Sequence, residues 1–341
     1  MSVKKMHILA CLVATTSMVG TSQAAPVIVL SNDFTNATRV GAPPTALDPT
    51  LIVTGVDADS GTTNRWVAAV SGNTSMAVST QASDLATNVG TGINGNSLFV
   101  TNSGSPYSLT TTFAQQSLVA TGDKLTLTLN IRTPTTGTLP VPAFNTGAGV
   151  FQVGLFSTPT TTILGANTNS FSGATYVSPT TIGTGTVFND DAGYIGRYNT
   201  SATTVTSEVR DRSGGTGVNL FAGTFTTVAG TSVASTSTIA VDTTYAVLLE
   251  LERTATGVRI TSSFNGSSVD VTDTTTPNLN FNQIGVFFGS AFGLAASRAN
   301  FVDDVVVTFT PVPEPATLAL TAAALLGLAA TGKRRLAVTP G

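Results

Sequence analysis

The chain of 341 residues has very little of the side-chain chemistry that most metal and nucleophile sites need. It contains one cysteine, Cys11, and one histidine, His7, and both lie within residues 1–24. Beyond that segment the sequence therefore excludes disulfides, cysteine or histidine nucleophile–base pairs, and metals held by histidine or cysteine. Carboxylates, hydroxyls and a few aromatic rings remain as candidate functional groups.

Charge is also scarce. Only 10% of the residues are charged, against roughly 25% in ordinary soluble proteins. Residues 25–310 carry 10 basic and 17 acidic side chains, which gives this segment a net charge of −7. Because a nucleic-acid partner requires a basic footprint, this balance argues against one. Serine and threonine supply roughly a quarter of the chain, and β-branched threonine favours extended structure.

The N-terminal residues 1–24 have the pattern of a signal peptide. Lys4-Lys5 precede an apolar run over Met6–Val19, and Ser22-Gln23-Ala24 supply small residues for cleavage before residue 25. Cys11 superficially resembles a lipoprotein acceptor, but the apolar run before it is too short for a signal core. We therefore predict a helical export signal, with the export machinery as the first partner.

The C-terminal residues 311–341 have a second distinctive pattern. The motif Val312-Pro313-Glu314-Pro315-Ala316 precedes an apolar stretch over 317–331, and Lys333-Arg334-Arg335 follow it. The prolines oppose helix before the motif, whereas leucine and alanine favour helix after it. Residues 316–332 are 17 in number, which is the short limit for a bilayer span. We predict a short transmembrane helix with the basic cluster on the cytoplasmic side.

This arrangement resembles the PEP-CTERM sorting domain. The resemblance assigns 311–335 to a sorting signal and 336–341 to a cytoplasmic tail. It implies a Gram-negative-type bacterium, an exosortase-type enzyme as partner, transient anchoring in the inner membrane, and delivery to the cell surface or an exopolysaccharide matrix. A plain C-terminal membrane anchor is the alternative.

The intervening body, residues 25–310, alternates apolar and polar residues with a period of two, which predicts half-buried strands. In Lys124–Arg132 every second residue is apolar, and Tyr245 to Leu251 repeat the pattern. Asn265-Gly266 predicts a tight hairpin turn. Further predicted strands are Val27–Leu30, Ser97–Thr101, Val150–Phe156, Val258–Ile260, Val269–Val271, Ile284–Phe288 and Phe301–Phe309.

Many short alternating strands predict an all-β fold, an antiparallel β-sandwich of jelly-roll type. The order of the last elements, a hairpin, a glycine-containing strand and a final strand before the tail, resembles the concanavalin A-like or laminin G-like jelly rolls. A galactose-binding-like jelly roll is the nearest alternative.

Glu250-Leu251-Glu252 is the one close pair of glutamates in the sequence. Residues two apart on a strand point to the same face, ~6.5–7 Å from each other, a spacing that would suit an inverting glycosidase. Jelly-roll glycanases with catalytic glutamates on one strand have a Glu-x-Asp-x-x-Glu pattern, and this sequence departs from it. We therefore predict that both glutamates lie on a solvated face beside Arg253 or Arg259.

Acidic residues elsewhere suggest calcium, the only cofactor that the sequence supports. Asp303 and Asp304 lie on the predicted last strand, where some carbohydrate-binding jelly rolls place a ligand, and Asp33 would come from the first strand. One of the two final aspartates should face inward, where a cation, hydrogen bonds or Arg298 would have to satisfy it. The acidic turn Asn189-Asp190-Asp191 is explained by ordinary turn chemistry.

Aromatic residues are few, although sugar-binding jelly rolls usually stack exposed rings on their ligands. Tyr194 and Tyr198 lie four apart in a stretch that reads as turn-rich, and they are the candidate glycan-binding rings together with Trp66. The alternative role for all three is packing.

These features favour an exported, non-enzymatic protein of the cell surface or matrix that binds extracellular polysaccharide. A jelly-roll glycan hydrolase or lyase is the alternative, and it would require a groove with two facing carboxylates and aromatic walls.

Overall fold

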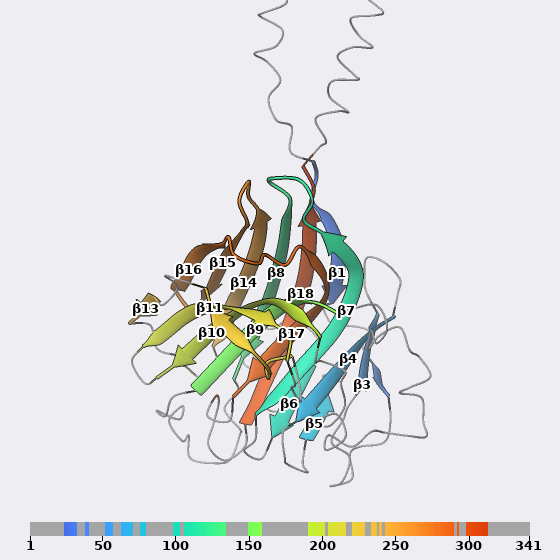
Figure 1. Ribbon diagram of the computed structural model, residues 1–341. Coiled ribbons are helices and arrows are strands. Elements are labelled where there is room, and N and C mark those ends of the chain that lie inside the picture. Colours follow the sequence, from blue (N-terminus) through green and yellow to red (C-terminus); the bar gives the residue numbers. More distant parts are fainter. Residues whose placement is uncertain are drawn as a thin grey trace, which may run out of the picture. The chain divides into compact units, whose positions relative to one another are not determined.

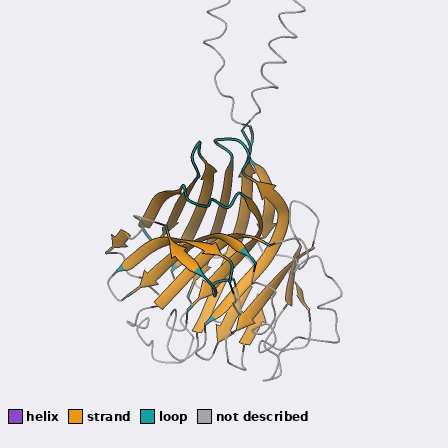
Figure 2. Cartoon of the chain, viewed as in Figure 1, coloured by secondary structure: helices purple, strands orange, loops and turns teal. Residues whose placement is uncertain are grey.

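A computed structural model describes the side chains of 24–32, 106–133, 149–158, 190–201, 204–215, 220–228, 233–236, 239–240, 243–289, 292 and 300–312. It describes the backbone alone of 38–40, 52–56, 63–70, 76–79, 98–102 and 298–299. Residues Val27–Phe309 form one compact unit. The described residues are strands and loops without a helix (Figure 2).

The strands build two antiparallel sheets (Figure 1). The first sheet has the order β16-β15-β14-β8-β18-β6-β5, and β1 also pairs with β18. Its strands are β1 (Val27–Asn32), β5 (Met76–Ser79), β6 (Leu98–Asn102), β8 (Lys124–Arg132), β14 (Thr244–Arg253), β15 (Val258–Phe264), β16 (Ser267–Asp273) and β18 (Arg298–Thr310).

The second sheet has the order β12-β11-β10-β9-β17-β7-β4-β3-β2, with β13 also paired to β11. Its strands are β2 (Thr38–Val40), β3 (Ile52–Val56), β4 (Thr63–Val70), β7 (Tyr107–Ser117), β9 (Gly149–Ser157), β10 (Ala192–Thr200), β11 (Val205–Ser213), β12 (Phe225–Thr227), β13 (Val233–Ser235) and β17 (Asn280–Phe288). Because the chain passes between the sheets, several pairings join distant segments, as in a jelly roll: β18 pairs with β1 and β6, and β17 pairs with β7 and β9.

One shared core fills the space between the two sheets. Alternate residues of β8, β14 and β15 meet alternate residues of β9, β10 and β17 in a single apolar cluster. Phe151 of β9 lies at its centre, with ring contacts to Phe264 of β15 and to Phe288 of β17. The period-two pattern of the sequence thus produces a two-layer sandwich, because each sheet buries one face against the other.

The all-β prediction is confirmed, and every strand predicted above has a counterpart in the structure. The Asn265-Gly266 turn is also confirmed: both residues have positive φ, 47° and 74°, and Phe264 pairs with Ser267 across the turn. Positive φ at both central positions is typical of a type I′ hairpin, whose twist matches that of the strands.

The stretch around Tyr194 and Tyr198 was interpreted as turn-rich, and that interpretation was wrong. It forms β10, a central strand between β9 and β11. Gly196 in the middle of this strand allows close packing, since a Cβ there would lie 2.1 Å from Ser262 Oγ of the other sheet. Glycine inside a strand often marks such a close approach.

Candidate functional site

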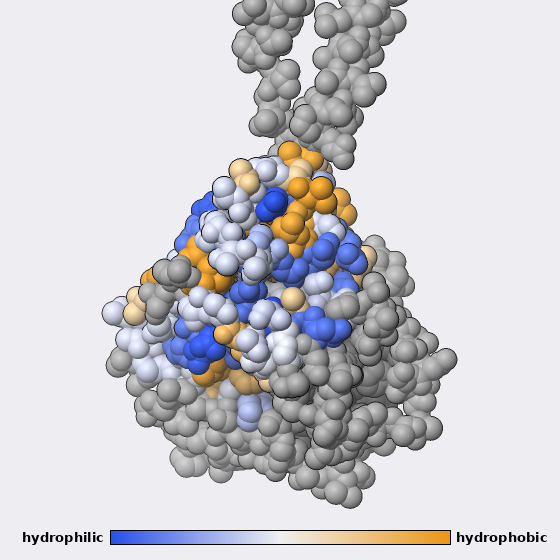
Figure 3. All heavy atoms as spheres, viewed as in Figure 1, coloured by the Kyte–Doolittle hydropathy of each residue, from blue (hydrophilic) through white to orange (hydrophobic). Residues whose placement is uncertain are grey.

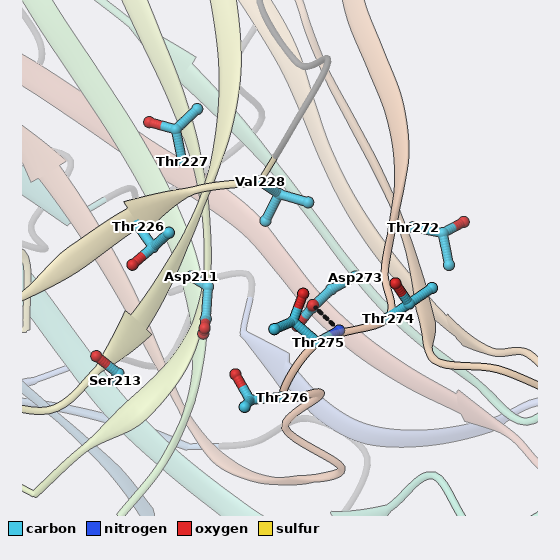
Figure 4. A pocket seen from close by; sticks show the side chains of 10 residues that line it. All are labelled: Asp211, Ser213, Thr226, Thr227, Val228, Thr272, Asp273, Thr274, Thr275 and Thr276. Carbon is cyan, nitrogen blue, oxygen red and sulfur yellow. Dashed lines mark hydrogen bonds between the residues drawn. The ribbon is translucent and has the colours of Figure 1, made fainter.

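A polar pocket of about 410 Å³ opens where the edges of the two sheets meet (Figure 4). Strands β11 and β12 form one wall, and the end of β16 with the loop that follows it forms the other. Seven of its ten lining residues carry a hydroxyl group, two are aspartates and one is a valine. They are Asp211, Ser213, Thr226, Thr227, Val228, Thr272, Asp273, Thr274, Thr275 and Thr276.

The edge position of this pocket follows from the topology. Strand β11 pairs with β12 along Arg210–Arg212 and with β13 along Val205–Ser207, so its outer edge is covered in two separate stretches. The facing edge strand of the other sheet is β16. Side chains at the end of β11 and of β16 that would continue the core are instead aspartates, and the sandwich is open there.

Asp273 is the most buried residue of the pocket, with an exposed fraction of 6%. The hydroxyl of Tyr194 donates a hydrogen bond to its Oδ2 at 2.8 Å. The backbone amide of Thr275 donates to its Oδ1 at 2.9 Å (Figure 4). The backbone amide of Asn278 in turn donates to the Tyr194 hydroxyl at 3.1 Å. Asp273 is therefore held in one orientation by donors from both sheets.

Asp211 belongs to β11, on the opposite wall, and is half-buried. Burial, reinforced by the nearby charge of Asp273, raises the pKa of the Asp211 carboxyl to about 6. Desolvation disfavours the ionised form of a carboxyl group, and a like charge close by adds to that effect. The two carboxyl groups therefore form an electrostatically coupled pair across the pocket.

A close backbone approach positions the end of β16. Gly257, in the turn between β14 and β15, lies against the backbone of Asp273, and a Cβ added there would come within 1.8 Å of the Asp273 carbonyl oxygen. Val258 then pairs directly with Asp273. Any side chain at position 257 would push the backbone of Asp273 and Thr274, the floor of the pocket, away from this turn.

The rim of the pocket is made of exposed threonine hydroxyls above the buried Asp273. Hydroxyl groups both donate and accept hydrogen bonds, whereas ionised carboxylates only accept. The lining can thus satisfy a ligand that carries many hydroxyl groups. It contains no aromatic ring among its ten residues, so ring stacking is not part of its chemistry.

The prediction that Tyr194 and Tyr198 are exposed stacking rings is wrong. Both are fully buried in the core between the sheets. They lie four apart on β10, so both point to the inner face. The Tyr198 hydroxyl contacts Ser262 of the other sheet, whereas Tyr194 supports the pocket through Asp273. Trp66 lies on β4, paired with Val53, and its side chain is outside the described residues.

Glu250 and Glu252 lie on the outer face of the first sheet, as predicted. Lys124 Nζ is 3.2 Å from Glu250 Oε1 and 3.5 Å from Glu252 Oε2, and Arg259 Nη1 is 3.6 Å from Glu252 Oε2. Both glutamates are half-buried within this ion-pair network rather than fully solvated. The pocket described above lies elsewhere, and sequence reasoning missed it because its two aspartates are 62 residues apart.

Asp303 and Asp304 lie where β18 changes its partner. Residues 298–302 of β18 pair with β6, and residues 305–309 pair with β1. Asp304 has a φ of 49°, and its backbone amide donates to Asp303 Oδ1 at 2.9 Å. Asp303 is fully buried, and Asp304 accepts a hydrogen bond from Asn130 at 2.8 Å. The prediction of one inward-facing aspartate is confirmed.

The calcium assignment itself stays a prediction. Asp33 lies outside the described residues, although its neighbour Asn32 is buried and pairs with Val305, beside Asp304. No group of three or more metal-binding side chains occurs within the part of the chain that the structure describes.

Asp191 is another buried carboxyl group; it directly precedes β10 and has no exposed surface. Burial raises its pKa to about 6, and the charge of the nearby Arg212 opposes this rise. The Arg212 guanidinium is itself buried and donates to the backbone oxygens of Asp191 and Ala222. Asp191 thus joins a buried charged pair that fixes the start of β10, beyond the turn chemistry that the sequence suggested.

Of the sorting motif, the structure describes Val312, which is half-buried, and Pro313 to Ala316 lie outside the described residues. Within the described residues no helix is long and apolar enough to cross a membrane. The exposed large hydrophobic residues of the described part are Val27, Ile28, Val119 and Val233. Figure 3 shows blue and near-white residues on this face, with an orange patch near the top.

No known family model matches this chain. No curated protein matches it either. Remote similarity to solved structures includes a galectin-like protein of unknown function from Bacillus subtilis, at 11% identity over 73% of this chain and 90% of that one, with a TM-score of 0.34. A legume lectin-like domain from Entamoeba histolytica has 13% identity over 65% and 87%, with a TM-score of 0.34. Alginate lyase AlyC3 with dimannuronate has 6% identity over 64% and 76%, with a TM-score of 0.35.

Proposed function

We propose that this protein is an exported, non-enzymatic surface or matrix protein that binds a glycan in the pocket at the sandwich edge. The observation that carries the proposal is the lining itself, seven hydroxyl-bearing residues and two carboxyl groups around about 410 Å³. That volume is in the usual range for small-molecule sites. A saccharide unit presents mainly hydroxyl groups, which match such a lining as donors and acceptors.

Binding without catalysis is favoured by how Asp273 is held. Both of its oxygens accept hydrogen bonds from protein donors, and the side chain is almost completely buried. A catalytic base or nucleophile has to reach a water molecule or a sugar carbon. The absence of aromatic rings among the ten lining residues also fits a shallow binding site better than a glycanase cleft.

The pocket also favours one alternative, a glycan hydrolase. A carboxyl group whose pKa is raised to about 6, such as Asp211, beside a second carboxyl group is the usual setting of a general acid. Asp211 would then protonate the leaving oxygen, and Asp273 would act as the partner carboxylate. In this alternative the catalytic carboxyl groups are Asp211 and Asp273 rather than Glu250 and Glu252.

A glycan array with the purified protein, with and without calcium, tests the proposal, and each binding polysaccharide is then assayed for new reducing ends. We expect binding without cleavage. Cleavage that disappears in an Asp211→Asn variant would establish the hydrolase alternative instead. Absence of binding to every glycan would overturn the binding function.

Export and sorting form the other half of the proposal, and they rest on the residues of the two chain ends. Deleting 311–341 should release the body into the medium, because this segment carries the apolar stretch and the basic cluster. A double substitution of Pro313 and Pro315 by Ala keeps the apolar stretch and separates motif-dependent sorting from plain anchoring. Cell-bound truncated protein at the level of the intact chain would contradict surface retention by the tail.

A further inference from the structure

The ionisable side chains that line the pocket are acidic. Among the ten lining residues that the structure describes, two are ionisable, Asp211 and Asp273, and both are acidic. The neighbours of Asp211 on β11, Arg210 and Arg212, point to the opposite face of the sheet, because side chains alternate along a strand. Arg210 pairs with Glu208 at 2.7 Å, and Arg212 is buried against backbone oxygens.

The wall from the other sheet offers no cation either. Arg259 is paired with Thr272 of β16 in the strand register, but its side chain lies on the outer face, where it binds Asp270 and approaches Glu252. On the pocket side, Asp273 is stabilised by the uncharged donors Tyr194 and Thr275. The elements around Asp211 thus present to it the ionisable groups Asp273 and Tyr194 and otherwise hydroxyl groups.

We propose that this pocket selects glycans that carry a free, protonated amino group, such as 2-amino sugar units without an N-acetyl group, over neutral sugars and uronates. The inference rests on the proposed glycan-binding function and adds the ligand class. An ammonium group beside Asp211 would donate a hydrogen bond to that half-buried carboxylate, and its charge would offset the repulsion between Asp211 and the buried Asp273. A uronate carboxylate would instead add a third negative charge to a half-desolvated site.

The same geometry gives binding a characteristic dependence on pH. The Asp211 carboxyl, with its pKa near 6, loses its charge as the pH falls below that value. A sugar amine that titrates like an α-amino group loses its charge above roughly pH 8. Binding of an amino sugar should therefore be strongest near pH 7 and weaken on both sides. Binding of a neutral sugar should lack this maximum.

The test uses the purified full chain and matched oligosaccharides, a hexamer of β-1,4-linked glucosamine and the same hexamer fully N-acetylated. A mannuronate hexamer serves as the acidic probe. Calorimetric titrations at pH 5, 7 and 9 give the dissociation constants. We expect the amino hexamer to bind at least about tenfold more tightly than the N-acetylated hexamer at pH 7, with a smaller ratio at pH 5 and pH 9.

Two variants separate the pocket from the general negative charge of the protein. Asp211→Asn removes a desolvated carboxyl group in the pocket and should abolish the preference for the amino hexamer. Asp270→Asn is the matched control, because Asp270 is an exposed aspartate on the outer face of β16, three residues from Asp273. It should leave the preference unchanged.

Each outcome decides the inference. A preference that has its maximum near pH 7, is lost in Asp211→Asn and persists in Asp270→Asn supports it. Equal binding of the amino and N-acetylated hexamers overturns the ligand class but leaves the glycan-binding function standing. A preference that both variants reduce equally overturns it in favour of non-specific charge attraction. If no glycan binds at all, the proposed function fails together with this inference. Should Asp211→Asn fail to fold, the pH profile of the unaltered chain decides alone.

Discussion

Two groups of carboxylates lie on neighbouring parts of this sandwich, and their surroundings differ. Glu250, Glu252 and Asp270, the outer carboxylates, face solvent beside Lys124 and Arg259. The pocket carboxylates, Asp211 and Asp273, face each other among hydroxyl groups. The outer carboxylates have the ion pairs of an ordinary sheet surface, which contribute little to stability.

The pocket carboxylates are different because their charge is not neutralised by a basic side chain of the lining. Two coupled carboxyl groups in a partly buried position cost stability that a merely structural role would not require. Carboxylates that are close together in the sequence therefore do not mark the candidate site in this protein. The glutamates that are two residues apart form a surface network, whereas the functional candidates come from separate sheets.

The largest expected effect comes from breaking the floor of the pocket. Gly257→Ala places a Cβ against the carbonyl oxygen of Asp273, and backbone cannot move aside as a side chain can. We expect a loss of about 2–3 kcal/mol in the free energy of unfolding, together with weaker glycan binding. Urea denaturation measures the first quantity. Thr256→Ala, at the exposed neighbouring position, is the control and should change neither.

A third group of carboxylates lies where β18 passes from pairing with β6 to pairing with β1, and the effect of calcium on stability tests its role. If Asp303 and Asp33 hold a calcium ion, adding excess chelator should lower the melting temperature, because a ligand that binds the folded state stabilises it. At a free calcium concentration a hundred times the dissociation constant, binding would raise the free energy of unfolding by about 2.7 kcal/mol. Asp303→Asn should remove the response to calcium. An identical melting curve in chelator would leave hydrogen bonding as the explanation for the buried Asp303.

Removing one hydroxyl group tests whether Tyr194 positions Asp273. Tyr194→Phe leaves Asp273 Oδ2 and the amide of Asn278 without this partner, which should cost about 1–3 kcal/mol and weaken glycan binding. Tyr198→Phe is the matched control, since its hydroxyl is equally buried but contacts Ser262 away from the pocket. It should lower stability without changing glycan affinity. Equal affinity losses in both variants would contradict the positioning role.

The smallest effect is expected on the outer face. Replacing Glu250 and Glu252 together by Gln removes the pairs with Lys124 and Arg259, each worth about 1 kcal/mol or less. Glycan binding should not change, since these side chains lie outside the pocket lining. Loss of binding in this double variant would move the site to the outer face of the first sheet.

Much of the fold could be predicted from the sequence, because a sandwich imposes a local signal. Lys124–Arg132 coincides with β8, and the Asn265-Gly266 turn has the φ angles that its residues favour. The strand containing Tyr194 was missed because Gly196 serves close packing against Ser262 of the other sheet rather than a turn. This close approach arises only when β10 and β15 pack face to face, so the local sequence does not reveal it.

The candidate site could not be predicted for a related reason. Asp211 and Asp273 meet only through the order of the strands in each sheet, which places β11 and β16 on the same edge of the sandwich. Neither aspartate stands in a motif. Each aspartate left one local signal, because it breaks the apolar alternation of its strand: Asp211 follows Val205 and Val209 on β11, and Asp273 follows Val269 on β16.

The most direct measurement is hydrogen–deuterium exchange of the full chain with and without a bound glycan, followed by mass spectrometry. If the glycan binds in the pocket, exchange should be slower with glycan present in the peptides that cover the lining segments 211–213, 226–228 and 272–276. Peptides that cover Glu250 in β14 and Arg259 in β15 should exchange at the same rate in both states. Protection confined to those two strands, or spread evenly over the sandwich, would contradict the assignment of the glycan site to the pocket.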